Sequence, residues 1–270
     1  MNVPYAEVIG DPISHSRSPL IHRFWLAKLG LSGDYRRTRV APGDLSRYLD
    51  GASADADWRG CNVTIPHKIS ITNLVADPEG ARETIGAMNI VTRATDGSLQ
   101  GRNTDAGGFG ATIEHLDLGG APALIIGAGG AARAVLFALR KAGIGFVTLQ
   151  NRDVGKAAEL LARFGMAGEA RPLGSPPPAA SIVVNASALG MIGMPPLDLD
   201  LDRMPPEAVV YDAVYAPLET PLLTRARARG LRTIDGLELL VAQAALAFAL
   251  FFGVEPPRAF DRELRAALTA

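Results

Sequence analysis

Short apolar runs recur through the second half of the chain and alternate with longer segments of helical composition. Five runs have the length and apolar content of buried strands: residues 123–126, 146–150, 181–185, 209–215 and 231–234. The segment between the first two, residues 131–142, is rich in Ala, Leu and Arg and predicts a helix ending near Gly143. This alternation predicts a doubly wound parallel sheet.

The first hundred residues predict a second α/β region. Strands are expected at residues 5–9, 34–40, 61–65 and 99–102. A short helix is expected at 43–49, and Pro19 suits the first turn of another. Asp96-Gly97 predicts a hairpin turn. Late in the chain, residues 237–252 are apolar on most faces and predict a well-buried helix.

Composition narrows the class of protein. The 270 residues are 48% hydrophobic and 20% charged with a net charge of −1, which is typical of a globular protein of one or two domains. Such balanced charge favours neither nucleic acid nor an anionic membrane as partner. Residues 1–10 lack a signal-peptide pattern, and 237–252 is too short and polar for a membrane span. Cys61 is the single cysteine, so the sequence predicts no intramolecular disulfide and a reducing, cytoplasmic location.

A glycine-rich turn follows the first strand of the parallel sheet. Gly127, Gly129 and Ala132 occupy the small positions of G-x-G-x-x-A, between strand and helix. Gly127 allows a tight turn, Gly129 lets a pyrophosphate approach the backbone, and Ala132 lets helix and strand pack closely. A plain Gly/Ala-rich turn is the alternative, but the strand–turn–helix–strand context favours a dinucleotide site.

Cofactor choice depends on the end of the next strand. Asn151 is neutral where an NAD-selective site carries Asp or Glu, and Arg152 with Lys156 could hold a 2′-phosphate. Asp153 opposes this, because it would repel that phosphate if it faces the ribose. We therefore expect NADP, with NAD possible.

Several polar residues precede helices or follow strands in the first region. Ser16 and Ser18 could hold a carboxylate, although Ser18 as a simple helix cap explains the pair equally well. Lys68 could transfer a proton in a dry site, against the alternative of a solvated surface lysine. Asn89 lies in an apolar run and needs a partner, and Asp105 is either functional or a helix cap. No ligand spacing indicates a metal site.

Collinear motifs resemble the shikimate dehydrogenase family over nearly the whole chain. They are Gly10-Asp11-Pro12, His15-Ser16-Arg17-Ser18-Pro19, Asn62-Val63-Thr64-Ile65-Pro66-His67-Lys68, Gly86-Ala87-Met88-Asn89, Asn103-Thr104-Asp105, the glycine loop, Asn151-Arg152, Tyr211-Asp212, Tyr215-Ala216-Pro217, Asp235-Gly236 and Gln243-Ala244-Ala245. The Asn-Val-Thr-x-Pro-x-Lys and Asn-Thr-Asp motifs are the specific ones.

The resemblance implies an α/β fold of two domains separated by a cleft. A substrate domain would comprise residues 1–103 with 237–270, and a Rossmann-type NADP domain residues 104–236. The implied reaction is reversible hydride transfer between NADPH and the C3 carbonyl of 3-dehydroshikimate, which gives shikimate for aromatic amino acid synthesis. Such an enzyme would be a monomer or homodimer.

The resemblance also assigns residues to roles. Lys68 and Asp105 would form the catalytic pair, with Ser16 and Ser18 on the substrate carboxylate. Asp105 and four further residues would line the ring hydroxyls: Thr64, Asn89, Tyr215 and Gln243. The cofactor would contact Gly127, Ala128, Gly129, Gly130, Ala131, Asn151, Arg152, Asp153, Lys156, Val214 and Gly236.

Four positions depart from the family pattern: Ile90, Asp153, Ser187 and Val214. They leave the catalytic pair intact and open two alternatives, a paralogue that uses quinate or a related acid with NAD, and a nucleotide-binding regulator without catalysis. The Ser16/Ser18 pair resembles the shikimate-selective members. The presence of both Lys68 and Asp105 argues against a regulator.

Overall fold

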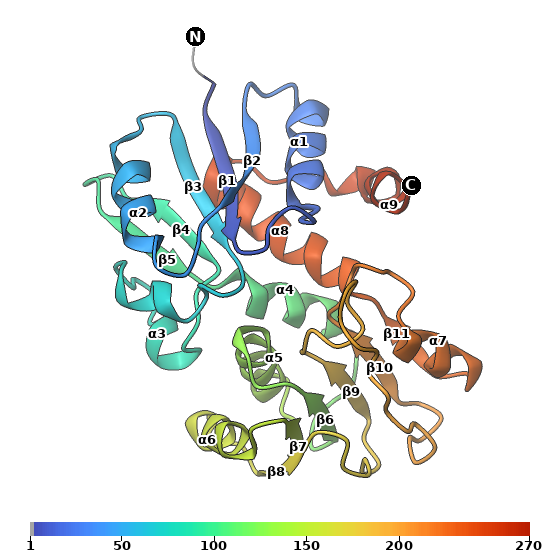
Figure 1. Cartoon of the computed structure of the whole chain (residues 1–270). Helices are drawn as coiled ribbons and strands as arrows, with labels where there is room; N and C mark the ends of the chain where they lie inside the picture. Colours follow the sequence, from blue (N-terminus) through green and yellow to red (C-terminus); the bar gives the residue numbers. More distant parts are fainter. Residues whose placement is uncertain (1–2) are drawn as a thin grey trace. The chain divides into compact units, whose positions relative to one another are not determined.

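The structure is a computed structural model that describes residues 3–270 and divides into two compact units (Figure 1). The first comprises residues up to 107 together with 241–270, and the second is 108–240. The division falls inside helices α4 (Thr104–Ile113) and α8 (Gly236–Phe252), which carry the chain between the units. The domain boundaries expected from sequence, after residues 103 and 236, coincide instead with the starts of these helices.

A five-stranded mixed sheet forms the centre of the first unit, in the order β2-β1-β3-β4-β5. Its strands are β1 (Tyr5–Gly10), β2 (Asp34–Arg39), β3 (Trp58–Val63), β4 (Ile90–Arg93) and β5 (Leu99–Arg102). The first three are parallel, and β4 and β5 run antiparallel as the predicted hairpin. The strand expected at 61–65 starts earlier and stops at Val63, because the chain turns toward Pro66.

The helices of the first unit follow the sequence signals with shifted ends. They are α1 (Ser18–Leu29), α2 (Leu45–Ala54), α3 (Ala81–Thr84), α9 (Asp261–Thr269) and the 3₁₀ turns η1 (Ser70–Asn73) and η2 (Arg258–Phe260). Pro19 lies in the first turn of α1, and Gly30 ends that helix in the left-handed conformation. The helix predicted at 43–49 runs later, from 45 to 54, since Asp44 rather than Gly43 precedes its first turn.

A six-stranded, wholly parallel sheet forms the second unit, in the order β11-β10-β9-β6-β7-β8. Its strands are β6 (Pro122–Ile126), β7 (Phe146–Asn151), β8 (Gly168–Pro172), β9 (Ile182–Asn185), β10 (Val209–Asp212) and β11 (Arg232–Ile234). Strand β8 was not predicted, and the strand expected at 209–215 ends at Asp212. Its helices are α5 (Gly130–Lys141), α6 (Val154–Phe164) and α7 (Pro221–Ala228).

Apolar side chains bury both faces of this sheet. Helices α5 and α6 cover one face together with Phe109 and Ile113, and α7 with Leu197, Leu199 and Leu201 covers the other. Strand order reverses between β6 and β9, so the loops after these strands diverge at the point where open α/β sheets bind ligands. No helix within residues 3–270 is long and apolar enough to cross a membrane.

Candidate active site

Lys68 and Asp105 form an ion pair whose side chains are both largely buried. Lys68 Nζ lies 2.5 Å from Asp105 Oδ2, and the two side chains are 18% and 11% exposed. Lys68 lies in the turn between β3 and η1, and its carbonyl accepts from Met88 N at 2.8 Å. The lysine is therefore not the solvated surface residue of the alternative interpretation, because its backbone and its ammonium are both held.

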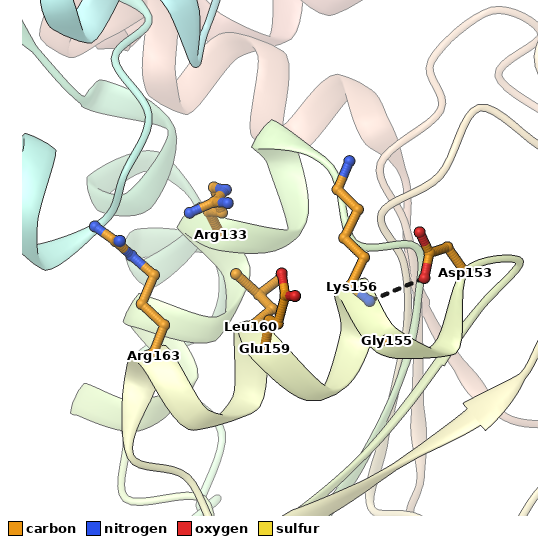
Figure 2. Close-up of a pocket in the computed structure, with 7 residues that line it drawn as sticks. All are labelled: Arg133, Asp153, Gly155, Lys156, Glu159, Leu160 and Arg163. Atoms are coloured by element: carbon orange, nitrogen blue, oxygen red, sulfur yellow. Dashed lines mark hydrogen bonds between the residues drawn. The ribbon is translucent and has the colours of Figure 1, made fainter.

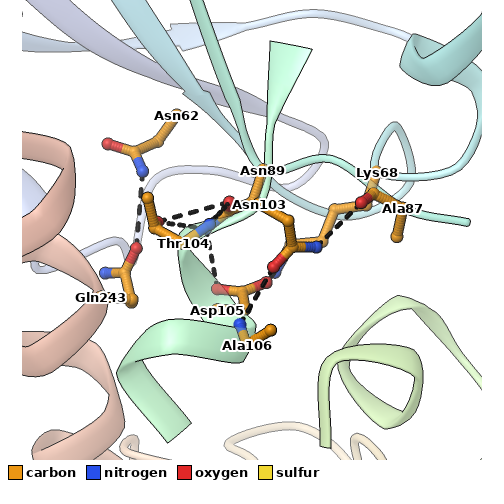
Figure 3. A network of polar contacts seen from close by, with 9 residues as sticks. All are labelled: Asn62, Lys68, Ala87, Asn89, Asn103, Thr104, Asp105, Ala106 and Gln243. Atoms are coloured by element: carbon orange, nitrogen blue, oxygen red, sulfur yellow. Dashed lines mark hydrogen bonds and ion pairs between the residues drawn. The ribbon is translucent and has the colours of Figure 1, made fainter. Parts of the chain in front are cut away.

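Asn89 organises the carboxylate side of this pair. Its Nδ2 donates to Asp105 Oδ1 and to Thr104 Oγ1, each at 2.9 Å, and its Oδ1 accepts from Thr104 N at 2.7 Å (Figure 3). The partner expected for the buried Asn89 amide is thus the start of α4. Asp105 does not cap that helix: Asn103 Oδ1 accepts from Ala106 N at 3.0 Å, which leaves the Asp105 carboxylate for Lys68 and Asn89.

Ser16 and Ser18 are both buried, 8% and 5% exposed, just before and at the start of α1. Ser18 is not the cap of this helix, because it already has helical geometry and Arg17 occupies the cap position without a side-chain bond. Ser16 Oγ instead accepts from Ser18 N at 3.3 Å. Arg37 fixes the segment by donating from Nε and Nη2 to the Ser16 carbonyl at 2.9 and 2.7 Å.

Three further candidates lie at different places on the two units. Thr64 follows β3 and packs so close to Gly10 that a Cβ there would approach Thr64 Cγ2 to 2.5 Å. Gln243, on the part of α8 that belongs to the first unit, is 7% exposed and accepts from Asn62 Nδ2 at 3.5 Å. Tyr215 belongs to the second unit, three residues beyond β10, and is half-buried.

The glycine loop of the second unit fits a pyrophosphate. Gly127 has φ +102°, and a Cβ there would lie 3.1 Å from Ala186 O and Ser187 atoms, so only glycine suits this turn. A Cβ at Gly129 would meet nothing within 4 Å, which leaves open space beside the start of α5. Gly129 is the N-cap of α5 and has no side chain that could accept from the first helical N–H groups. Backbone donors facing open space are the arrangement that binds phosphate.

Val214 and Gly236, both expected at the cofactor, are neighbours. A Cβ at Gly236 would lie 2.5 Å from the Val214 carbonyl, so the close approach requires glycine. Asp212 anchors Val214 by accepting from its N–H at 3.0 Å, and the same carboxylate accepts from Asn185 and Thr220. Burial raises the pKa of Asp212 although these hydrogen bonds lower it.

A basic pocket of about 430 Å³ opens between α5 and α6 on the second unit (Figure 2). Its lining residues are Arg133, Asp153, Gly155, Lys156, Glu159, Leu160 and Arg163. Asp153 is the N-cap of α6 and accepts from Lys156 N at 3.0 Å. Burial and the nearby Arg163 lower the pKa of Arg133, because both disfavour its charged form. An anion in this pocket would relieve that repulsion.

Sequence reasoning missed three residues of these sites. Arg133 directly follows Ala132, and a basic residue one turn into the helix was an available signal. Arg163 gave no signal, since helix arginines are mostly solvated. Asn62 was part of a recognised motif, but its link to Gln243 spans 181 positions of sequence.

Comparisons with known proteins point to one family. Residues 8–91 match the family described as the shikimate dehydrogenase substrate binding domain, and residues 236–264 the shikimate 5′-dehydrogenase C-terminal domain. The chain is 57% identical to a protein of Sphingopyxis alaskensis named shikimate dehydrogenase (NADP(+)), over 99% of this chain and 97% of the relative.

Solved structures of related dehydrogenases have a similar fold over nearly the whole chain. A shikimate 5-dehydrogenase of Thermus thermophilus in complex with NADP(H) and shikimate superposes with a TM-score of 0.85 at 36% identity, covering 98% of this chain and 99% of that chain. A quinate dehydrogenase of Corynebacterium glutamicum in complex with NAD superposes with a TM-score of 0.87 at 30% identity, covering 98% and 99%.

Proposed function

The chain belongs to the shikimate dehydrogenase family, and from that premise we propose that it interconverts 3-dehydroshikimate and shikimate with NADP(H). It is an oxidoreductase that acts on a CH–OH group. The observation that carries the assignment is the Lys68–Asp105 pair, held by Asn89 at the start of α4.

Lys68 supplies the proton. Reduction of a ketone places negative charge on its oxygen, so an acid must lie within hydrogen-bond reach of that oxygen. The Lys68 ammonium has three donors, of which one meets Asp105 Oδ2. Asp105 holds the ammonium in place, and Asn89 in turn fixes the rotamer of Asp105.

Hydroxyl and amide side chains of the same unit hold the rest of the substrate. Ser16 and Ser18 donate to its carboxylate, and Arg37 keeps them in place through the Ser16 carbonyl. Thr64, Asn89 and Gln243 meet ring hydroxyls. A site built from such groups rejects analogues that lack the hydroxyls, because its buried polar atoms would be left unpaired.

NADP binds the second unit at the glycine loop and the basic pocket. When bound, NADP would supply or take up the hydride. Residues 127–131 bind the pyrophosphate, and Asn151, Arg152, Asp153 and Lys156 surround the adenosine ribose. Arg133 and Arg163 add positive charge to the pocket that Lys156 lines, which favours a 2′-phosphate there. Val214 and Gly236 form a close-packed backbone surface for the nicotinamide.

Cellular role follows from this activity. We propose that the enzyme works in the cytoplasm in the synthesis of chorismate and aromatic amino acids, as a monomer or homodimer. The single cysteine supports a reducing compartment, since Cys61 is buried and unpaired.

The test is NADP-dependent oxidation of shikimate, followed by absorbance, beside quinate and other cyclic hydroxy acids with both NADP and NAD. We expect the highest kcat/KM for shikimate with NADP. Preference for quinate with NAD would favour the paralogue. Absence of turnover with every acid, combined with retained NADP binding, would favour a regulator.

A further inference from the structure

Tyr35 is a fully buried tyrosine of the first unit whose hydroxyl contacts Asn62. It lies on β2 with no solvent exposure. Its ring stacks on His22 with centroids 4.0 Å apart and planes 3° from parallel, and Phe251 lies 6.2 Å away. These rings fix the Tyr35 side chain, so the direction of its hydroxyl is fixed as well.

The hydroxyl of Tyr35 donates to Asn62. Burial raises the pKa of Tyr35 well above its ordinary value, so the group stays protonated. Its oxygen lies 2.5 Å from Asn62 Oδ1. An amide oxygen has no hydrogen, so the proton of this contact belongs to Tyr35. The contact therefore decides which end of the buried Asn62 amide faces β2.

Asn62 in turn contacts the amide of Gln243. With its oxygen on Tyr35, Asn62 presents Nδ2 on the other side, where it donates to Gln243 Oε1 over 3.5 Å (Figure 3). The amide of Gln243 is thus oriented with its acceptor toward Asn62. Its donor end, Nε2, is the end directed away from Asn62.

We propose that Tyr35 is a positioning residue that sets the donor–acceptor sense of Gln243 through Asn62. This inference rests on the proposed function, in which Gln243 meets a ring hydroxyl of shikimate. Gln243 then donates to that hydroxyl rather than accepting from it. The preference for a hydroxyl oxygen at this ring position then originates two hydrogen bonds away, at the buried Tyr35 phenol, which does not touch the substrate.

Tyr35→Phe tests the relay, because it removes the hydroxyl and keeps the ring on His22. Without the donor, the Asn62 amide can flip, and it then no longer presents Nδ2 to Gln243 Oε1. We expect KM for shikimate to rise about 3- to 10-fold, as for loss of one oriented hydrogen bond. We expect kcat within about twofold and an unchanged KM for NADP, since neither depends on Gln243.

Tyr48→Phe is the matched control. Tyr48 is a half-buried tyrosine in the same unit, and its hydroxyl donates to Glu7 Oε1 at 2.7 Å. Its variant measures the general cost of losing a hydrogen-bonded tyrosine hydroxyl. We expect it to lower the melting temperature and to leave KM for shikimate unchanged.

A second experiment introduces Tyr35→Phe into the Gln243→Ala variant. If Tyr35 acts through Gln243, the effect on KM disappears there. An equal rise in both backgrounds, or a KM for Tyr35→Phe no different from that of Tyr48→Phe, overturns the relay while leaving the proposed function in place. Wild-type enzyme inactive on shikimate overturns the proposed function instead.

Discussion

Lys68 Nζ and Asp105 Oδ2 lie 2.5 Å apart although 37 positions separate the residues in sequence. The turn after β3 provides the lysine, and the first turn of α4 provides the carboxylate. Asn89, just before β4, ties the two together by donating to the second oxygen of Asp105. Three separate segments of the first unit thus converge on one proton-transfer group.

Asp105→Asn keeps the shape of this carboxylate and removes its charge. We expect kcat to fall at least about tenfold, because the Lys68 ammonium loses the partner that holds it. Steady-state kinetics with shikimate and NADP measure this, with Asp198→Asn, an exposed carboxylate that pairs with Arg225 at 2.6 Å, as the control. Wild-type kcat in Asp105→Asn would show that the ion pair has no part in the reaction.

Ser16→Ala and Ser18→Ala separate carboxylate binding from helix stability. Each hydroxyl on a charged acceptor is worth roughly 1.5–3 kcal/mol, so each variant should raise KM for shikimate roughly 10- to 100-fold. Thermal melting without substrate should be lower for Ser16→Ala, which removes the acceptor of Ser18 N, and unchanged for Ser18→Ala. Lower melting temperatures with unchanged KM values would make both serines structural.

Lys156→Ala should weaken the binding of NADP and leave the binding of NAD unchanged. Lys156 lines the basic pocket with Arg133 and Arg163, and only NADP carries a 2′-phosphate to place there. We expect KM for NADP to rise about tenfold or more, since a charge-assisted bond is lost. Asp153→Thr should shift preference further toward NADP, because Thr preserves the helix cap without the negative charge. Equal losses for the two cofactors would place the 2′-phosphate elsewhere.

His22 makes stability fall in mild acid. It is fully buried, neither ring nitrogen has a hydrogen-bond partner among residues 3–270, and burial lowers its pKa to about 3. Well above pH 6.5 the ring is neutral in both the folded and the unfolded state, so its titration does not change the free energy of unfolding. As pH falls below 6.5, only the unfolded chain takes up the proton, so the native state loses about 2 kcal/mol by pH 5.

The difference between wild type and His22→Leu isolates this effect, because other titrating groups cancel. Denaturant unfolding at pH 7 and pH 5 should show wild type losing about 2 kcal/mol more than the variant. Parallel pH dependences would mean that His22 is protonated in the native state.

Local patterns predicted the fold well where burial dictates composition. The apolar runs of β6, β7, β9 and β10 were recognisable because parallel strands are covered on both faces. Strand β8 was missed, since its residues are mostly half-exposed and carry two charges. The glycine loop was predictable because backbone conformation itself demands Gly127.

The candidate site was less accessible to sequence reasoning. Lys68 and Asp105 were recognised through family motifs, and no periodicity relates them. The alternative roles of Ser18 and Asp105 as helix caps were wrong. Arg17 occupies the cap position of α1, and Asn103 accepts the capping hydrogen bond at the start of α4. The Tyr35–Asn62–Gln243 contacts join β2, β3 and α8, and only tertiary packing brings these together.

The most direct test of the account is the kinetics of Lys68→Ala beside Lys141→Ala, an exposed lysine at the end of α5. Proton transfer by a positioned group contributes about 10²–10⁴-fold to rate. Lys68→Ala should therefore lose that factor in kcat for shikimate oxidation by NADP, with KM within about tenfold of wild type, while Lys141→Ala stays at wild type. Wild-type turnover by Lys68→Ala would contradict the assignment of Lys68 as the proton-transfer group.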